Sequence, residues 1–405
     1  MKKNFIKLSL IIPCLFFIFS SCDKINVEKE REDILLTKGE QEITTNINKF
    51  AFDFFRNISI DSKKPNIFIS PLSASLALSM AAIGAEGETG SQMKTLLGFE
   101  NCTTPEMNSY YKKITEELLN LDPKNTITMA NSIWIANGFD IKTNFTSNAQ
   151  TYYGAYVANV DFNNQNTLNR INDWCSNNTN NKIKKIFDEL NPNLKLLLIN
   201  ALYFKGTWTQ QFDKKNTYET SFNTLSGESE NVDMMYIESN FKYTSNDFFQ
   251  IAEFPYGNEA FSMVILLPKE NISFKTAVNQ FTYANWNMWM SSMDYTEISV
   301  HLPKFKLEYE IKLNDVLCSM GMPNAFNPML ANFSGISDIK LYIDFVKQNT
   351  YINVNEEGTE AAAVTSTGMF VTSMPESKIF RADRPFIYFI KEKSTGIILF
   401  IGQKG

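Results

Sequence analysis

The sequence is poor in the residues from which most enzyme active sites are built. Its 405 residues include a single histidine, His301, and only five cysteines, of which Cys102, Cys175 and Cys318 lie far apart along the chain. A Ser-His-Asp or Cys-His arrangement would have to use His301, which lies in an alternating, strand-like pattern and is therefore expected to be structural. The chain has no GxSxG, HExxH or CxxC pattern. We expect a protein that is not an enzyme and that needs no metal ion and no cofactor.

The chain also lacks a basic patch. It has 38 Lys and Arg against 44 Asp and Glu, so its net charge is -6, and the charges are spread along the chain. Nucleic acid is therefore not expected as a partner. Hydrophobic residues make up 44% of the chain and include 33 Phe, which is enough for a large core. From residue 43 onward there is no linker and no repeat, so we expect one compact domain.

Residues 1–21 have the pattern of a secretory signal. They begin with lysines and continue into the apolar run Leu8–Phe19, which is short for a membrane span. The ending FSSC resembles a bacterial lipoprotein signal, in which cleavage leaves a lipid on Cys22; a plain signal peptide cut nearby is the alternative. Residues 22–42 are charged and are expected to be a tether. We therefore expect export across the inner membrane, a membrane anchor through Cys22 in the bacterial envelope, and the outer-membrane surface among the locations allowed.

Helical patterns precede strand patterns along the rest of the chain. Four apolar residues of the first helical stretch fall on one stripe: Ile47, Phe50, Phe54 and Phe55. Ser70 and Pro71 form a good helix start, and helix-forming residues follow as far as Gly84. Residues 297–311 alternate like a strand, and residues 386–390 and 397–401 form an apolar hairpin. The order predicts a mixed α+β domain.

The stretch EEGTEAAAVTSTGMFVTSMPES, residues 356–377, fits no single structure. As a strand it would have one face that is small and uncharged, formed by Thr359, Ala361, Ala363, Thr365 and Thr367. Thr, Val, Ser and Gly disfavour a helix in its later part. The composition allows an inserted strand and also an ordinary Ala-rich loop.

Five motifs decide in favour of a family. VNEEGTEAAAVT, residues 354–365, resembles the proximal hinge of the serpins, a family of serine protease inhibitors that trap their target. Four further stretches resemble serpin motifs in the same order: residues 66–93, 200–208, 302–322 and 380–403. The resemblance covers roughly residues 43–405.

The resemblance implies a fold and a mechanism. The fold is a single serpin domain over residues 43–405, with a large mixed, five-stranded central sheet, surrounding helices and an exposed reactive-centre loop at about 356–380. Such a chain is a metastable, suicide-type protease inhibitor: the cut loop inserts into the sheet as a new strand, and the protease is trapped covalently. The hinge would comprise Glu356, Gly358, Thr359, Glu360, Ala361, Ala362, Ala363 and Val364. The alternative is a non-inhibitory binding protein of the same fold.

The resemblance also places the reactive bond. The residue before the cut lies fourteen positions after the hinge glycine in this family, which gives Thr372–Ser373, with cleavage after Phe370 as the second choice. A small residue at the cut suits elastase-like, subtilisin-like or papain-like proteases as partners. We expect the inhibitor to be a monomer.

Two sets of control residues follow from the same resemblance. Trp208 and the pair Lys304–Glu356 would lie at the top of the sheet, where insertion begins. Four residues would lie at mid-sheet, where the strands part: Ser70, Ser73, Asn200 and Gln348. Gln348 stands where the family usually has a histidine.

Overall fold

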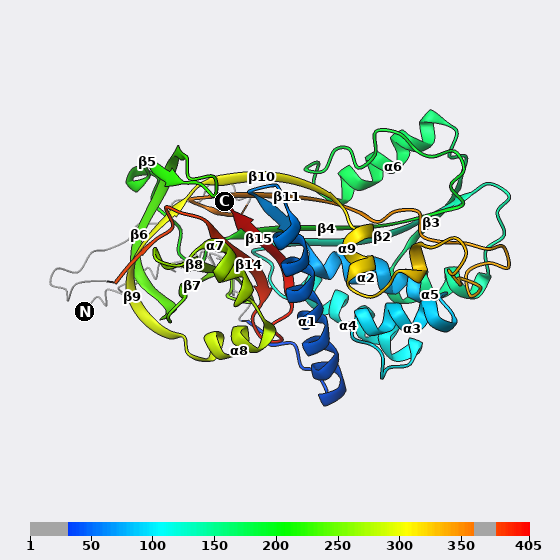
Figure 1. The fold of residues 1–405 in the computed structure, drawn as a ribbon, viewed down its shortest axis with the longest axis horizontal. Coiled ribbons are helices and arrows are strands. Elements are labelled where there is room, and N and C mark those ends of the chain that lie inside the picture. Colours follow the sequence, from blue (N-terminus) through cyan, green and yellow to red (C-terminus); the bar gives the residue numbers. More distant parts are fainter. Residues whose placement is uncertain (1–30, 360–377) are drawn as a thin grey trace, which may run out of the picture.

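The computed structural model describes residues 31–359 and 378–405. Within these ranges the chain forms two β-sheets surrounded by helices, so the predicted α+β class is confirmed (Figure 1). None of the helices in the described ranges is long and apolar enough to cross a membrane.

Six longer helices form most of the N-terminal part. They are α1 (Lys38–Asp61), α2 (Pro71–Ala82), α3 (Gly87–Leu96), α4 (Thr104–Asn120), α5 (Thr143–Tyr153) and α6 (Gln165–Asn178). Shorter helices follow: η1 (Lys214–Asn216), α7 (Phe274–Asn279), α8 (Tyr283–Ser291), α9 (Asn314–Ser319) and η2 (Asn324–Phe326).

Local sequence signals account for the first two helices. The predicted apolar stripe of α1 is buried, and α2 begins after Ser70, whose hydroxyl accepts a hydrogen bond from the Ser73 backbone, with Pro71 in its first turn. Helix α1 begins at Lys38, within the stretch 22–42 that we expected to be a tether. The reason is a capping box, in which Thr37 and Glu40 exchange hydrogen bonds between side chain and backbone.

The central sheet has six strands in the described residues. Their order is β10 (Phe305–Lys312), β11 (Lys347–Asn355), β12 (Gly358–Thr359), β4 (Leu196–Thr207), β2 (Thr126–Ala136) and β3 (Tyr156–Val160). In Figure 1, α6 lies on one side of this sheet, and α2, α4 and α5 lie on the other. The expected five strands are therefore joined by a sixth, β12, because two hinge residues already pair within the sheet.

Most of the other sheet lies in the left half of Figure 1, beside one end of the central strands. Its order is β1 (Ile67–Ile69), β15 (Ile398–Lys404), β14 (Phe386–Glu392), β8 (Phe261–Pro268), β7 (Phe249–Tyr256), β6 (Ser229–Ser245), β9 (Asp294–Pro303) and β13 (Lys378–Arg381), and β5 (Tyr218–Asn223) pairs with β6. Strands β14 and β15 are the predicted hairpin, and almost all of their residues are buried.

One strand prediction was wrong. Residues 297–311 alternate like a single strand, but they belong to β9 and β10, which lie in different sheets. The chain changes sheets at Lys304, whose backbone N–H still donates to the carbonyl oxygen of Asp233 on β6 (2.8 Å), one residue beyond the β6/β9 ladder, before Phe305 pairs with Val354 in the central sheet. Alternation reports the two faces of each strand but carries no information about which sheet the strand joins.

Candidate functional site

The hinge enters the central sheet between two long strands. Gly358 and Thr359 pair antiparallel with Asn355 and Val354 of β11 on one side, and with Thr207 and Gly206 of β4 on the other. In the described part of the chain no ladder joins β11 directly to β4. The two strands are therefore bridged at this end of the sheet by two residues of the hinge.

Glycine is required at the first of these positions. Gly358 has a φ of 150°, which side chains of L-residues rarely adopt. A Cβ atom at this position would overlap the backbone carbonyl oxygen of Gly206 on the neighbouring strand. The hinge glycine therefore permits a close approach to β4 that no other residue would allow.

Thr359 is fully enclosed in the sheet. Its side chain is 2% exposed, and its hydroxyl lies 2.6 Å from the hydroxyl of Tyr256 on β7. The ring of Tyr256 stacks on the indole of Trp208, with the centroids 4.4 Å apart. The small polar side chain at position 359 therefore provides the buried hydrogen-bond partner of Tyr256, whose ring stacks on Trp208.

Trp208 donates two hydrogen bonds to the residues that lead into the inserted strand β12. Its indole N–H donates to the carbonyl oxygen of Asn355 (2.9 Å), and its backbone N–H donates to that of Glu357 (2.9 Å). Trp208 is 3% exposed. Trp208 therefore contacts both Asn355 and Glu357, which lie directly before the inserted residues Gly358 and Thr359.

Glu356 is buried but has several polar partners. Its carboxylate accepts a hydrogen bond from the Thr217 hydroxyl (2.8 Å) and lies 3.3 Å from the Lys304 ammonium, so the structure brings the expected pair together. Burial alone would raise the pKa of Glu356, but hydrogen bonds from its own backbone, Thr217 and Lys304, together with the charge of Lys304, hold that pKa below 4.5. The next residue, Glu357, pairs with Lys214 (2.6 Å).

Sequence reasoning missed Thr217, Lys214 and Tyr256. All three lie 100 residues or more before the hinge in the chain. No local pattern marks them, because they reach the hinge only through the way β7 and the segment after β4 pack against it.

The mid-sheet residues form two separate hydrogen-bonded groups. Gln348 accepts a bond from the Ser70 backbone N–H (3.0 Å) and donates to the Ser70 carbonyl (2.8 Å), and Ser70 caps the helix at Ser73. Asn200 donates instead to the side-chain oxygen of Asn131 on β2 (2.8 Å). Gln348 therefore ties β11 to the start of α2, while Asn200 is bound within the other half of the sheet.

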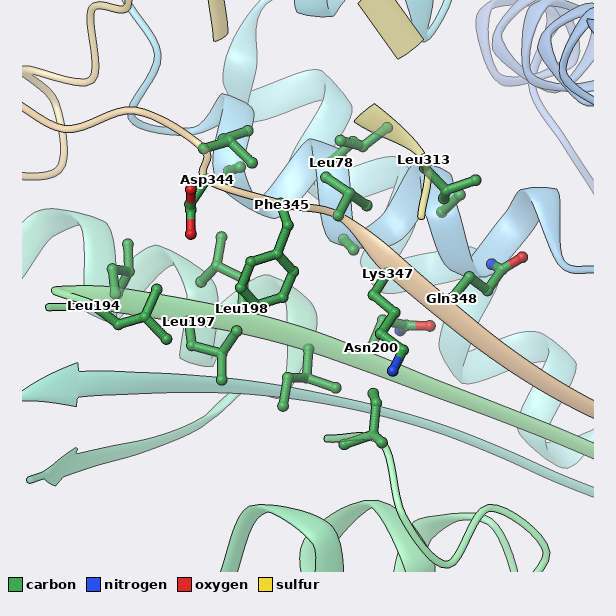
Figure 2. Close-up of a pocket in the computed structure, with 18 of the residues that line it drawn as sticks. Leu78, Leu194, Leu197, Leu198, Asn200, Leu313, Asp344, Phe345, Lys347 and Gln348 are labelled. Atoms are coloured by element: carbon green, nitrogen blue, oxygen red, sulfur yellow. The ribbon is translucent and has the colours of Figure 1, made fainter. Parts of the chain in front are cut away.

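A cavity of about 250 Å³ lies between these two groups. Its walls come from β4, β11 and α2, with further residues from α6 and from the segments before β4 and before β11. Figure 2 shows β4 and the chain entering β11 diverging around it, with Phe345 pointing between them. The cavity continues the gap that β12 fills at the other end of the two strands.

His301 lies on β9, away from the hinge residues just described. Its Nδ1 atom is 2.8 Å from the Tyr218 hydroxyl, and the ring of Tyr236 lies beside it. Burial, followed by the positive charge of Arg381, lowers the pKa of His301 below 6.5. The only histidine of the chain is thus a hydrogen-bonded residue in a strand.

Some predicted residues lie outside the described ranges. These are Cys22, Glu360, Ala361, Ala362, Ala363, Val364, Phe370, Thr372 and Ser373. Their assigned roles stay predictions.

Comparison with known proteins agrees with this geometry. Residues 45–404 match the family model described as serpin (serine protease inhibitor). The chain is 33% identical to an uncharacterized serpin-like protein of Methanosarcina mazei, over 98% of this chain and 97% of that protein. The native state of the thermophilic serpin tengpin superposes with a TM-score of 0.83 at 35% identity, covering 93% of this chain and 96% of tengpin. Human thyroxine-binding globulin complexed with its ligand superposes with a TM-score of 0.81 at 25% identity, covering 90% and 98%.

Proposed function

Because the chain belongs to the serpin family, whose members are inhibitors and binding proteins rather than enzymes, we propose that it is a suicide-type protease inhibitor. The reactive bond in this proposal is Thr372–Ser373. Cutting it lets the loop enter the central sheet between β11 and β4, which leaves the protease covalently attached.

The observation that carries the proposal is the pairing of Gly358 and Thr359 with both β11 and β4. A strand that already begins in the gap needs only to lengthen, so each further residue adds ladder hydrogen bonds on both sides. Insertion would release free energy because it fills the cavity between the same two strands.

The residues that follow the hinge suit this gap. Ala361, Ala363 and Thr365 would continue the face on which Thr359 is buried. All three are small and uncharged. A charged side chain on that face would be buried without a partner, and a proline would interrupt the ladder.

The chemistry of trapping is an interrupted acyl transfer. The protease serine oxygen bonds to the carbonyl carbon of Thr372, the bond from that carbon to the Ser373 nitrogen breaks, and this nitrogen leaves with a proton. Hydrolysis of the ester would free the protease. Insertion stops this second step by carrying the attached protease away and distorting its active site.

The loop composition suggests the class of target. No Lys or Arg lies between Glu357 and Lys378, so trypsin-like proteases are not expected to cut there. Thr372 suits elastase-like and subtilisin-like enzymes. Papain-like enzymes would read Val371 and form a thioester instead of an ester, and Phe370 offers a second cutting position to a chymotrypsin-like protease.

A non-inhibitory binding protein is the second candidate. The observation that favours it is the likeness to thyroxine-binding globulin, which was solved with thyroxine bound. Such a protein would be cut in the loop without retaining the protease.

One experiment separates the two candidates. The full chain is mixed with elastase, subtilisin or papain and run on a denaturing gel, and the melting temperature of the loop-cut chain is measured. An inhibitor gives a covalent adduct, and its melting temperature rises after cutting, whereas cleavage without an adduct and without that rise supports the binding protein. Thr372→Arg is the matched variant, because it should redirect adduct formation to trypsin.

The anchor proposed at Cys22 has its own test. Mass spectrometry of the protein from a bacterial membrane fraction should find a diacylglyceryl group on this cysteine, and Cys22→Ser should move the protein to the soluble fraction. An unmodified N-terminus at another residue would favour a plain signal peptide.

A further inference from the structure

Four exposed apolar side chains lie on one segment before β11. They are Met329, Leu330, Ile339 and Tyr342, which are 77%, 58%, 54% and 46% exposed. The Lys340 ammonium joins the two parts of this segment by donating to the carbonyl oxygen of Met329 (2.9 Å). Apolar side chains that gather on a surface mark a candidate contact with a partner. We call these four residues the apolar patch.

The segment that carries the apolar patch is anchored to the body of the protein. Ala331, Phe333 and Ile336 are buried, and the Ile343 backbone N–H donates to the carbonyl oxygen of Ala325 (2.8 Å). The same segment therefore places some apolar side chains in the core and presents others to solvent. The exposure of the patch does not come from a lack of contacts in the segment.

The apolar patch lies at the end of the central sheet away from the hinge. Residues 327–346 lead into Lys347, the first residue of β11, whereas Gly358 and Thr359 pair with residues at the other end of that strand. In Figure 1 this segment is drawn in orange at the right. A partner of the patch would therefore have to lie at the end of the sheet opposite β12.

The register of β12 predicts where the reactive bond would arrive after insertion. Thr359 pairs antiparallel with Val354 of β11 and Gly206 of β4. Each further residue of an inserted strand would pair one position earlier on both neighbours. Thr372, which follows Thr359 by thirteen residues, would therefore lie opposite the positions thirteen before each of these partners.

The two positions obtained in this way are Leu341 and Asn193. Both line the cavity between β4 and β11, so counts along two different strands arrive at the same place in the structure. Leu341 is the neighbour of Tyr342 and lies two residues after Ile339. A protease attached to Thr372 would therefore lie beside the apolar patch.

The expected protease has an apolar surface near the bond that it forms. An elastase-like or subtilisin-like enzyme that cuts after Thr372 reads small and apolar side chains, so its recognition cleft is itself apolar. Drawing Phe370 and Val371 into the sheet would empty this cleft. The apolar patch offers side chains that would cover the emptied surface and remove it from water.

Resting on the inhibitory function proposed above, we propose that the apolar patch binds the recognition cleft of the trapped protease and slows the hydrolysis that would release it. In that hydrolysis a water oxygen bonds to the carbonyl carbon of Thr372, and the bond from this carbon to the protease serine oxygen breaks. The serine oxygen takes the proton that the water gives up. Contact with the patch limits the access of water to this ester.

The test measures how fast a formed adduct releases active protease. The full chain is mixed with elastase, the adduct is separated from free elastase, and the return of elastase activity is followed. The double variant Leu330→Ser with Ile339→Ser should form the adduct at an unchanged rate but release elastase roughly tenfold faster, because two apolar contacts are lost. Leu330→Met with Ile339→Leu keeps the apolar surface and should release elastase as slowly as the unaltered chain.

The matched control is Leu35→Ser with Leu119→Ser. These leucines are 81% and 40% exposed; Leu35 precedes α1, and Leu119 lies in the last turn of α4. Both are outside the segment that carries the apolar patch. This variant should release elastase within about twofold of the rate for the unaltered chain.

Three outcomes would overturn the role of the patch. These are unchanged release from the serine variant, equally fast release from the control or the conservative variant, and slower adduct formation in the serine variant, which would mean that the patch acts before insertion. The unaltered chain separates this proposal from the one that it rests on. If it forms no adduct, the inhibitory function is refuted and the patch loses this role, whereas adducts with unchanged release in the serine variant would refute only the patch.

Discussion

Replacing Lys304 with methionine should destabilise the native form by removing the ion pair at Glu356, the first residue of the hinge. Methionine keeps most of the apolar length of the side chain but removes the ammonium that lies 3.3 Å from the Glu356 carboxylate. Glu356 would retain its hydrogen bond from Thr217 and remain largely buried, with only 5% of its surface exposed. Its charge would then lack the nearby cation.

The expected cost follows from the burial of the two partners. Breaking a fully buried ion pair costs about 3–5 kcal/mol, whereas an exposed pair contributes at most about 1 kcal/mol. The Lys304 side chain is 35% exposed and that of Glu356 is 6% exposed, so we place the cost between these limits, at about 1–2 kcal/mol. If this contact is already lost in the transition state that leads to the relaxed forms, their formation should be roughly 5- to 30-fold faster.

The assay follows the loss of the native form at a constant temperature on native gels, which separate monomer, loop-inserted monomer and polymer. Lys306→Met is the matched control. Lys306 lies two residues away and pairs with Glu308, and both side chains are more than half exposed. Its replacement should leave the rate within twofold of the unaltered chain.

A double-mutant cycle with Glu356→Gln tests whether the pair itself is responsible. The coupling should be about 1 kcal/mol, because the second substitution has little left to remove once the first is made. Additive effects of the two substitutions, or an unchanged rate for Lys304→Met, would refute the role assigned to this contact.

Three further predictions concern other parts of the chain. Thr359→Arg should turn the inhibitor into a substrate, because a guanidinium cannot replace a side chain that is 2% exposed, whereas Thr359→Ser should still give adducts on a denaturing gel; adducts with the arginine variant would contradict insertion along this path. His301 should lower the melting temperature as the pH is decreased. The pKa of His301 in the folded chain lies below 6.5, so its contribution to stability is present above pH 6.5 and is lost as the pH decreases through the folded pKa. His301→Asn should lack this dependence, and an identical pH profile for both proteins would count against it. Lys391→Met should cost about 3–5 kcal/mol in urea unfolding, because it leaves the Glu253 carboxylate, 2.9 Å away and equally buried, without its cation. Adding Glu253→Met should recover most of that loss, and failure to do so would mean that packing rather than charge sets the cost.

Local signals in the sequence were sufficient for several elements. The cap at Ser70 and Pro71, the apolar stripe of α1 and the apolar hairpin near the C-terminus each follow from residues that are neighbours in the chain. The family resemblance supplied the contact between Lys304 and Glu356, which periodicity alone could not have found.

Residues far apart in the chain determine the remaining features. Whether β12 lies in the sheet depends on its register with β4 and β11, and the enclosure of Thr359 depends on Tyr256 from the other sheet. The orientation of Asn200 depends on Asn131 and, through it, on the carbonyl of Tyr153.

The sequence by itself determined the start of α2, the buried stripe of α1 and the C-terminal hairpin, because these depend on side-chain spacing and on the conformational limits of proline, whereas the hinge was placed by the family resemblance. Only the tertiary structure decided that the first hinge residues already pair between two strands and that Thr359 is enclosed against Tyr256 of the other sheet. The physical reason is that backbone pairing and buried hydrogen bonds join atoms whose separation in the chain carries no local pattern.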